Sequence, residues 1–173
     1  WHATHIHEAS PVLIPQTQRE LDGGHCPVAA PFNDGLWFDP TDGLFKLWYN
    51  AGWMNATSLA TSRDGLAWER PARDVLEGTN AVIRPRPGYR RDGCVVWLDN
   101  EAPKPDERFK MFLYFRWPGG EGGEIRTSPN GVHWSEPEPT SECGDNTSFF
   151  YNPFRRKYVF SIRQGWGFRA RAY

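Results

Sequence analysis

The chain has 173 residues, a formal net charge of −1 at pH 7 and 39% hydrophobic side chains. A charge this close to zero gives no electrostatic case for binding nucleic acid or an anionic membrane. No apolar run approaches the roughly 20 residues that a membrane-spanning helix needs. The length suits one domain and the apolar fraction suits a real core, so we expect a globular protein without nucleic-acid or membrane partners.

Residues 1–25 are expected to form an N-terminal arm ahead of a domain at residues 26–173. In that domain, short aromatic-rich runs alternate with Gly- and Pro-rich turns, which is typical of β-strands. No window keeps the i, i+3, i+4, i+7 apolar spacing of an amphipathic helix. We therefore predict an all-β fold with almost no long helix. The chain opens on Trp1 and has no signal-like segment, so we expect any targeting peptide to be removed or to lie outside it.

Three segments share one pattern, at residues 33–52, 91–116 and 144–163. Each opens with an aspartate, continues into an apolar or aromatic run, and reaches a turn residue that precedes a basic-aromatic strand. The opening aspartates are Asp34, Asp92 and Asp145, and the turn residues are Asp39, Asp99 and Asn152. The first copy is two residues shorter between these points, and a slip of two keeps a side chain on the same face of a strand. The pattern predicts three equivalent strands, each starting at an aspartate.

A second repeat lies between copies of the first, at residues 60–71 and 126–137. Both segments contain Thr-Ser, then Asp-Gly or Asn-Gly, then Trp. The Asp-Gly and Asn-Gly pairs are typical of hairpin turns that need a positive φ. We expect Ser62 and Ser128 at matching tight turns, with Trp68 and Trp134 at least half buried.

The two repeats together describe about four short strands in every 55 to 65 residues, which is typical of β-propeller blades. We predict a β-propeller of four-stranded antiparallel blades, with about three blades in this chain. Their expected bounds are 26–80, 81–140 and 141–173. The chain ends where a third Gly-Trp turn is due, so we expect either a fragment of a longer protein or open sheet edges that allow self-association.

Aspartates at equivalent positions of three innermost strands would converge on the propeller channel, where they would repel one another and shift their pKa values. The alternative is structural, because Asp before Gly is common in turns and both Asp34–Gly35 and Asp92–Gly93 fit that description.

Three motifs resemble the five-bladed propeller glycosidases of glycoside hydrolase families 32 and 43. They are "FNDG" with Asn33 and Asp34, "RDG" with Arg91 and Asp92, and "SEC" with Glu142. The resemblance implies a complete propeller of five blades, a secreted or periplasmic bacterial protein, and a role in carbohydrate metabolism. It implies Asp34 as nucleophile or base, Asp92 as transition-state stabiliser and Glu142 as general acid. Glycine replaces the families' proline in the first two motifs, and those motifs lie only about one blade apart.

Glycoside hydrolysis uses two carboxyl groups, one protonated to assist the leaving group and one ionised as nucleophile or base. Asp145 competes with Glu142 for the acid role, because it holds the repeat position. Residues three apart on an extended strand point to opposite faces, so we expect at most one of the two in the pocket. Asp92 is the strongest single candidate.

Sugars stack on aromatic faces, which makes Trp37, Trp53 and Trp97 candidates for substrate contact, with core packing as the alternative. Asn33, Arg91 and Arg163 are further substrate-binding candidates. Arg91 can equally be an ion-pair partner of a carboxylate.

We expect a glycoside hydrolase that acts on a poly- or oligosaccharide, with neither a cofactor nor a metal. The alternative is a non-catalytic propeller that binds glycans or protein through the same pocket. A phosphorylase would need a basic phosphate site, for which Arg90, Arg91 and Arg163 are only suggestive. Cys26, Cys94 and Cys143 lack C-x-x-C spacing and are interpreted as free thiols, with one disulfide or a metal site as alternatives.

Overall fold

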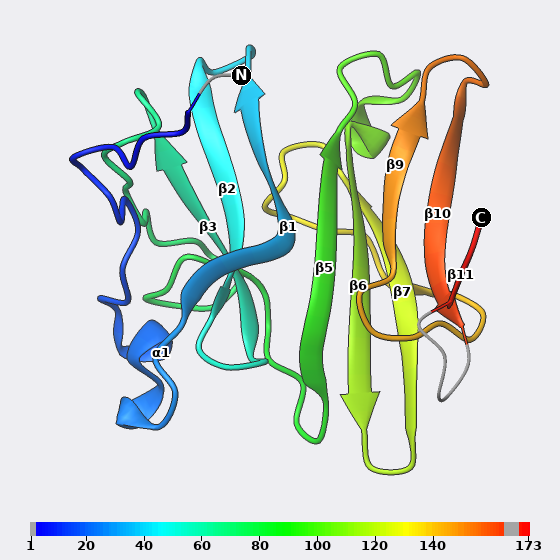
Figure 1. The fold of residues 1–173 in the computed structure, drawn as a ribbon, viewed down its shortest axis with the longest axis horizontal. Helices are drawn as coiled ribbons and strands as arrows, with labels where there is room; N and C mark the ends of the chain where they lie inside the picture. The colour runs from blue at the N-terminus through cyan, green and yellow to red at the C-terminus, as the bar shows by residue number, and fades with distance from the viewer. Residues whose placement is uncertain (1–2, 165–169) are drawn as a thin grey trace.

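A computed structural model describes residues 3–164 and 170–173, and its strands form three antiparallel sheets that stand side by side (Figure 1). The first sheet contains β1 (Ala29–Asp39), β2 (Leu44–Ala51), β3 (Ala56–Ser62) and β4 (Ala81–Ile83). The second contains β5 (Arg90–Leu98), β6 (Phe109–Trp117), β7 (Gly120–Ser128) and β8 (Glu138–Pro139). The third contains β9 (Ser148–Asn152), β10 (Lys157–Gln164) and β11 (Ala170–Ala172).

Within each of the first two sheets, strands follow one another in chain order, so each sheet is a meander of the kind that forms a propeller blade. The prediction of an all-β chain with about three blades is confirmed. Because β4 pairs with β3, the first blade extends to Ile83, slightly beyond the expected bound.

In residues 3–164 and 170–173, helix is confined to single turns, namely α1 (Gln18–Leu21), η1 (Asp22–Gly24) and η2 (Pro105–Glu107). No helix among the described residues is long and apolar enough to cross a membrane.

The first strands of the three blades are neighbours: β1 contacts β5, and β5 contacts β9. They run in the same direction in Figure 1. One apolar cluster, which includes Trp48, Val96 and Phe109, joins the first two blades. A second, which includes Phe112 and Phe149, joins the second and third. Burial between sheets is therefore what holds the blades together.

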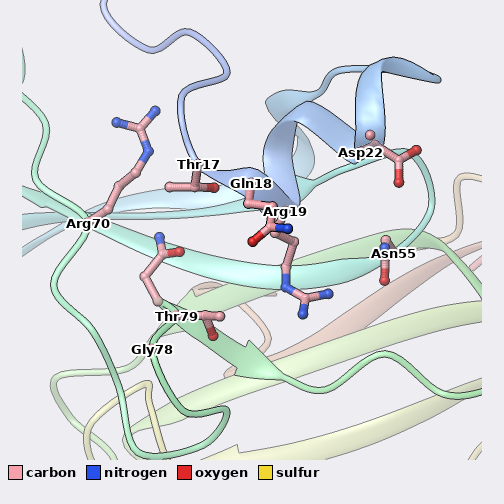
Figure 2. A pocket seen from close by; sticks show the side chains of 10 residues that line it. Thr17, Gln18, Arg19, Asp22, Asn55, Arg70, Gly78 and Thr79 are labelled. Atoms are coloured by element: carbon pink, nitrogen blue, oxygen red, sulfur yellow. The ribbon is translucent and has the colours of Figure 1, made fainter.

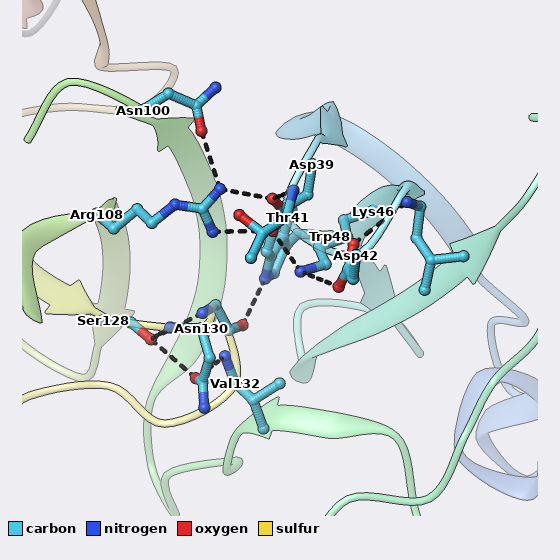
Figure 3. A network of polar contacts seen from close by, with 12 residues as sticks. Asp39, Thr41, Asp42, Lys46, Trp48, Asn100, Arg108, Ser128, Asn130 and Val132 are labelled. Carbon is cyan, nitrogen blue, oxygen red and sulfur yellow. Dashed lines mark hydrogen bonds and ion pairs between the residues drawn. The ribbon is translucent and has the colours of Figure 1, made fainter. Parts of the chain in front are cut away.

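The turn acids of the first two repeats each fasten their blade to the next one. Asp39 is buried and accepts hydrogen bonds from Lys46 Nζ at 2.6 Å and from both terminal nitrogens of Arg108, on the second blade, at 2.9 and 2.5 Å (Figure 3). Asp99 repeats the arrangement one blade later. It accepts from Lys110 Nζ at 2.9 Å and from the Tyr158 hydroxyl, on the third blade, at 2.7 Å. We call these two sets the inter-blade clasps.

The two Ser-Gly-Trp turns match in detail. Ser62 Oγ accepts from the Gly65 amide at 2.8 Å, and Ser128 Oγ accepts from the Gly131 amide at 2.9 Å. The tryptophans that follow, Trp68 and Trp134, are both mostly buried, so the prediction for these turns is confirmed. The second turn also touches the first blade, because the Trp48 indole donates to the Gly131 carbonyl at 3.0 Å.

Part of the N-terminal arm packs on the first blade. Thr17 and Glu20 form a capping box around α1, and the Glu20 carboxylate is fully buried. That carboxylate accepts from the Tyr49 hydroxyl at 2.5 Å and from Arg70 Nε at 2.7 Å. Leu13 packs against an apolar cluster that contains Tyr49.

Candidate functional site

Asp34 and Asp92 lie at different depths in their strands. Trp37 pairs with Lys46 in the first blade, and Trp97 pairs with Lys110 in the second. Counting back along each strand from its tryptophan, Asp92 occupies the position that Phe32 occupies in the first blade. Asp34 occupies the position that the buried Cys94 occupies in the second blade. Both strands carry a bulge beside their Asp-Gly pair, and the first copy places its aspartate two residues deeper.

Asp34 is fully buried between the first two blades and forms an ion pair with Arg91. Arg91 is itself only 1% exposed, and its Nε donates to Thr57 Oγ1 at 3.0 Å. A carboxylate enclosed this way has no access to a substrate in this arrangement, and the pair joins β1, β3 and β5. Sequence reasoning left the ion-pair role of Arg91 open, and the structure shows that role.

Asp92 and Asp145 both contact one guanidinium, that of Arg116. Arg116 Nη2, from β6, is 2.6 Å from Asp92 Oδ2 and 3.7 Å from Asp145 Oδ2. Asp92 comes from β5, and Asp145 comes from the loop before β9. The site therefore uses the second and third blades, and its arginine is 43% exposed, which leaves the cluster open to a ligand.

The surroundings of Asp92 favour its protonated form. Burial raises the pKa of this carboxyl above its ordinary value, and the neighbouring Asp145 and Glu121 raise the pKa further, while Arg116 and Arg91 lower it. The balance leaves the pKa of Asp92 raised, which is the property that a general acid requires.

Glu121 is a member of the site that sequence reasoning missed. It accepts a hydrogen bond from the Tyr114 hydroxyl, and burial together with this acceptor raises the pKa of Tyr114. The guanidinium of Arg116 lies 5.8 Å from the centre of the Tyr114 ring. A signal was present, since the tight Pro-Gly turn after Trp117 places Glu121 opposite Arg116 in a hairpin.

The remaining candidates occupy different places. Asn33 Nδ2 donates to Asn146 Oδ1 at 3.4 Å, which brings the first blade to the segment that carries Asp145. The Trp53 indole is 46% exposed and lies edge-on to Phe32, with ring centres 6.2 Å apart.

Trp37 is used between blades, because its indole donates to the Val96 carbonyl at 2.8 Å and packs edge-on against Trp97 at 4.8 Å. Arg163 is partly exposed, and its backbone holds the loop of Asp145 through the Gly144 amide at 3.1 Å.

Glu142 is exposed and lines a cavity of about 390 Å³ that Glu121 also lines. Asp145 instead reaches Arg116. The two acids therefore face different parts of this region.

The three cysteines are free thiols, and burial raises the pKa of Cys94 to about 11. Across residues 3–164 and 170–173, no group of His, Cys, Asp or Glu is arranged to hold a metal ion.

A polar cavity of about 500 Å³ lies between α1 and the first blade (Figure 2). Its lining includes Thr17, Arg19, Asn55 and Arg70, and none of the candidate carboxylates. Arg70 is already held by Glu20, Gln16 and the Ile14 carbonyl. This cavity is distinct from the cluster around Arg116.

Comparison with known proteins places the fold. No family model and no curated protein matches this sequence. Among solved structures, the fructofuranosidase from Schwanniomyces occidentalis complexed with fructose matches with a TM-score of 0.54 and 17% identity, over 75% of this chain and 28% of that one. The chain shares a β-propeller fold with this fructofuranosidase.

A variant of the same fructofuranosidase, complexed with fructosylnystose, matches with a TM-score of 0.54 and 15% identity, over 87% of this chain and 34% of that one. The propeller chain thus spans about a third of the length of these structures. At this identity the likeness concerns the fold alone.

Proposed function

We propose that this propeller is a glycoside hydrolase acting on a poly- or oligosaccharide, with Asp92 and Asp145 as its two reacting carboxyl groups. The observation that carries the proposal is that one nitrogen of Arg116 contacts both carboxyl groups. Paired carboxyls in an open site are what glycosidic bond cleavage requires, and a fold has no need to bring two such groups together.

The separation of the two groups favours retention of anomeric configuration. The two Oδ2 atoms can be no farther apart than the sum of 2.6 and 3.7 Å, their distances from Arg116 Nη2. That limit applies to one oxygen of each carboxyl group and includes the approximately 5 Å of retaining enzymes, so retention is the expected outcome.

In this mechanism Asp92 is the acid and Asp145 the nucleophile. Asp92 gives its proton to the glycosidic oxygen as the bond to the anomeric carbon breaks, and an oxygen of Asp145 bonds to that carbon. Water then releases the sugar from Asp145, and Asp92, now ionised, takes the proton of the water. Arg116 contacts both carboxyl groups, and burial raises the pKa of Asp92, which suits it to the acid role.

Asp34 has a supporting role in this proposal. Its buried pair with Arg91 orients the strand start that presents Asp92, the next residue along β5. Glu142 lines the same cavity as Glu121, where it can accept hydrogen bonds from sugar hydroxyls.

The test is release of reducing sugar from a glycan panel by the full chain, with Asp92→Asn and Asp145→Asn as variants. Each variant should lower kcat by about 10²- to 10⁴-fold. Asp42→Asn is the matched control, because Asp42 is an exposed carboxylate whose partner is Lys46. It should leave kcat unchanged.

Proton NMR of the first product should show the anomeric configuration of the substrate. Azide added to an Asp145→Ala variant should restore turnover by forming a glycosyl azide of inverted configuration. Full activity in Asp92→Asn would refute the assignment. Glycan binding without any hydrolysis by the unmodified chain would establish the alternative, a glycan-binding propeller.

A further inference from the structure

Two adjoining cavities flank the β6–β7 hairpin and share Tyr89 and Trp117. The first, of about 540 Å³, is also lined by Arg90 and Arg116. The second, of about 390 Å³, is also lined by Phe115 and by acids that include Glu121 and Glu142. We call the two together the hairpin groove.

The hairpin groove has an aromatic floor. The Tyr89 and Trp117 rings are 5.2 Å apart at an angle of 40°, and Phe115 meets Tyr89 edge-on at 6.2 Å. Tyr89 is 38% exposed, and Trp117 is partly exposed. Flat aromatic surface that remains accessible suits the apolar face of a pyranose ring.

Glycines make room for this floor. A Cβ at Gly120 would lie 2.7 Å from Trp117 Nε1, and one at Gly122 would lie 3.2 Å from Trp117 Cη2. The glycine-rich run at 118–123 therefore lets the indole lie against backbone.

The polar groups of the groove carry both signs. Arg90 is exposed and makes no side-chain hydrogen bond or ion pair to the part of the chain that the structure describes. Glu142 is exposed on the other side. Arg86 pairs with Glu124 at 2.9 Å and lies over the Tyr89 ring at 5.0 Å. Donors and acceptors together suit sugar hydroxyls, whereas a polyanion would meet the glutamates.

The groove is linked to the reacting pair through Arg116. Arg116, which contacts Asp92 and Asp145, lines the first cavity, and Glu121, which accepts from Tyr114, lines the second. A saccharide whose scissile bond lay at Asp92 would continue along the hairpin.

We propose that the hairpin groove binds further units of a neutral oligosaccharide, with Tyr89 and Trp117 as its stacking platform. The position of the groove next to a scissile bond rests on the proposed function. The inference goes beyond that function in stating that the protein selects chains of several sugars over disaccharides. Trp117 and Tyr89 then determine specificity for chain length and take no part in bond cleavage.

Calorimetric titration of the full-length Asp92→Asn protein tests the groove without hydrolysis. The probes are xylohexaose, cellohexaose, mannohexaose and nystose as neutral chains, and a hexamer of galacturonic acid as the acidic chain. A neutral chain should bind, and Tyr89→Ala or Trp117→Ala added to Asp92→Asn should weaken that binding about tenfold or more. Phe154→Ala, which removes an exposed aromatic ring outside the groove, is the control and should change little.

Trp117 also packs on the apolar core, so its variant must first match the melting temperature of the parent. Tyr89→Ala gives the same readout from a loop residue. Unchanged binding of every neutral chain in both groove variants, or binding of the acidic hexamer alone, overturns the groove. If hydrolysis is then still seen in the unmodified protein, the proposed function survives that failure. If binding depends on Tyr89 but no glycan is cleaved, the groove stands and the proposed function falls.

Discussion

Asp39 of the first repeat and Asp92 of the second have their pKa values shifted in opposite directions, and their neighbours explain why. Burial opposes the ionisation of both. At Asp39 hydrogen bonds from Arg108 and Lys46 outweigh burial, and the pKa falls well below its usual range. At Asp92 burial, Asp145 and Glu121 outweigh Arg116, and the pKa rises. Ionised Asp39 therefore stabilises the folded protein, whereas ionised Asp92 destabilises it.

Asp39→Asn should destabilise the protein by about 3 kcal/mol at pH 7, because it leaves Lys46 and Arg108 without their buried counter-charge. Since the folded pKa is depressed, the contribution of Asp39 is present above the unfolded value of about 3.9 and is lost as pH falls below it. Urea unfolding of both proteins between pH 3 and 7 checks this. Asp99→Asn changes the more exposed second clasp and should lower the free energy of unfolding by less than Asp39→Asn does. An equal loss in the two variants would contradict the argument from burial.

Asp92→Asn should be as stable as the parent or more stable at pH 7. Because the folded pKa is raised above about 3.9, the ionised carboxylate costs stability once pH rises through the folded value, and Asn removes that cost. The advantage should vanish near pH 3, where both forms are neutral. Thermal melts across this range are the measurement. A variant that is less stable at pH 7 than at pH 3, relative to the parent, would mean that the Arg116 pair dominates.

At the scale of single elements, the Ser-Gly-Trp turns show how one local motif acquires different neighbours. Both glycines adopt the left-handed region, with φ of 76° at Gly65 and 74° at Gly131. Nothing lies within 4 Å of a Cβ added at Gly65. A Cβ added at Gly131 would lie 2.5 Å from Cζ2 of the fully buried Trp48.

Gly65→Ala and Gly131→Ala therefore form a matched pair. Each should lose roughly 1 kcal/mol because alanine is strained at positive φ. Gly131→Ala should lose about 1 to 3 kcal/mol more, because the methyl group displaces the Trp48 ring in the core between blades. Chemical denaturation gives both values. Equal losses would mean that the turn can move away from Trp48 freely.

At the scale of the whole molecule, the second blade is the centre. Its β6 is buried along most of its length and contacts apolar clusters on both sides, toward the first and third blades. The third blade is less buried, because the side chains of β10 are partly exposed along nearly the whole strand. The stability of the blades should differ accordingly.

Native-state hydrogen exchange should show this gradient. The amides of β6 that pair with β5 should exchange at least about tenfold more slowly than those of β10 that pair with β9, because fewer buried contacts must open to expose β10. Mass spectrometry of peptides from residues 109–117 and 157–164 measures both. Equal protection would indicate that the three blades unfold as one unit.

The sequence predicted the blades because their signals are local and repeated. The side chains of Asp64 and Asn130 each accept hydrogen bonds from the backbone amides two and three residues ahead. Four or five consecutive residues therefore determine the geometry of each turn. The strand pattern and the turn acids could be found in the same way. The clasp role of Asp39 could not, because its partner Arg108 is on the next blade.

What the sequence determined by itself is the class of fold and the repeat frame, in which Asp92 and Asp145 hold the same position of the sequence repeat. Tertiary structure decided which acids meet. Strand register moved Asp34 two residues deeper, under Arg91, and the β6–β7 hairpin brought Arg116 and Glu121 to Asp92. The physical reason is that turn and strand preferences act over a few neighbours in the chain, whereas burial and charge pairing depend on distances between residues that the sequence leaves far apart.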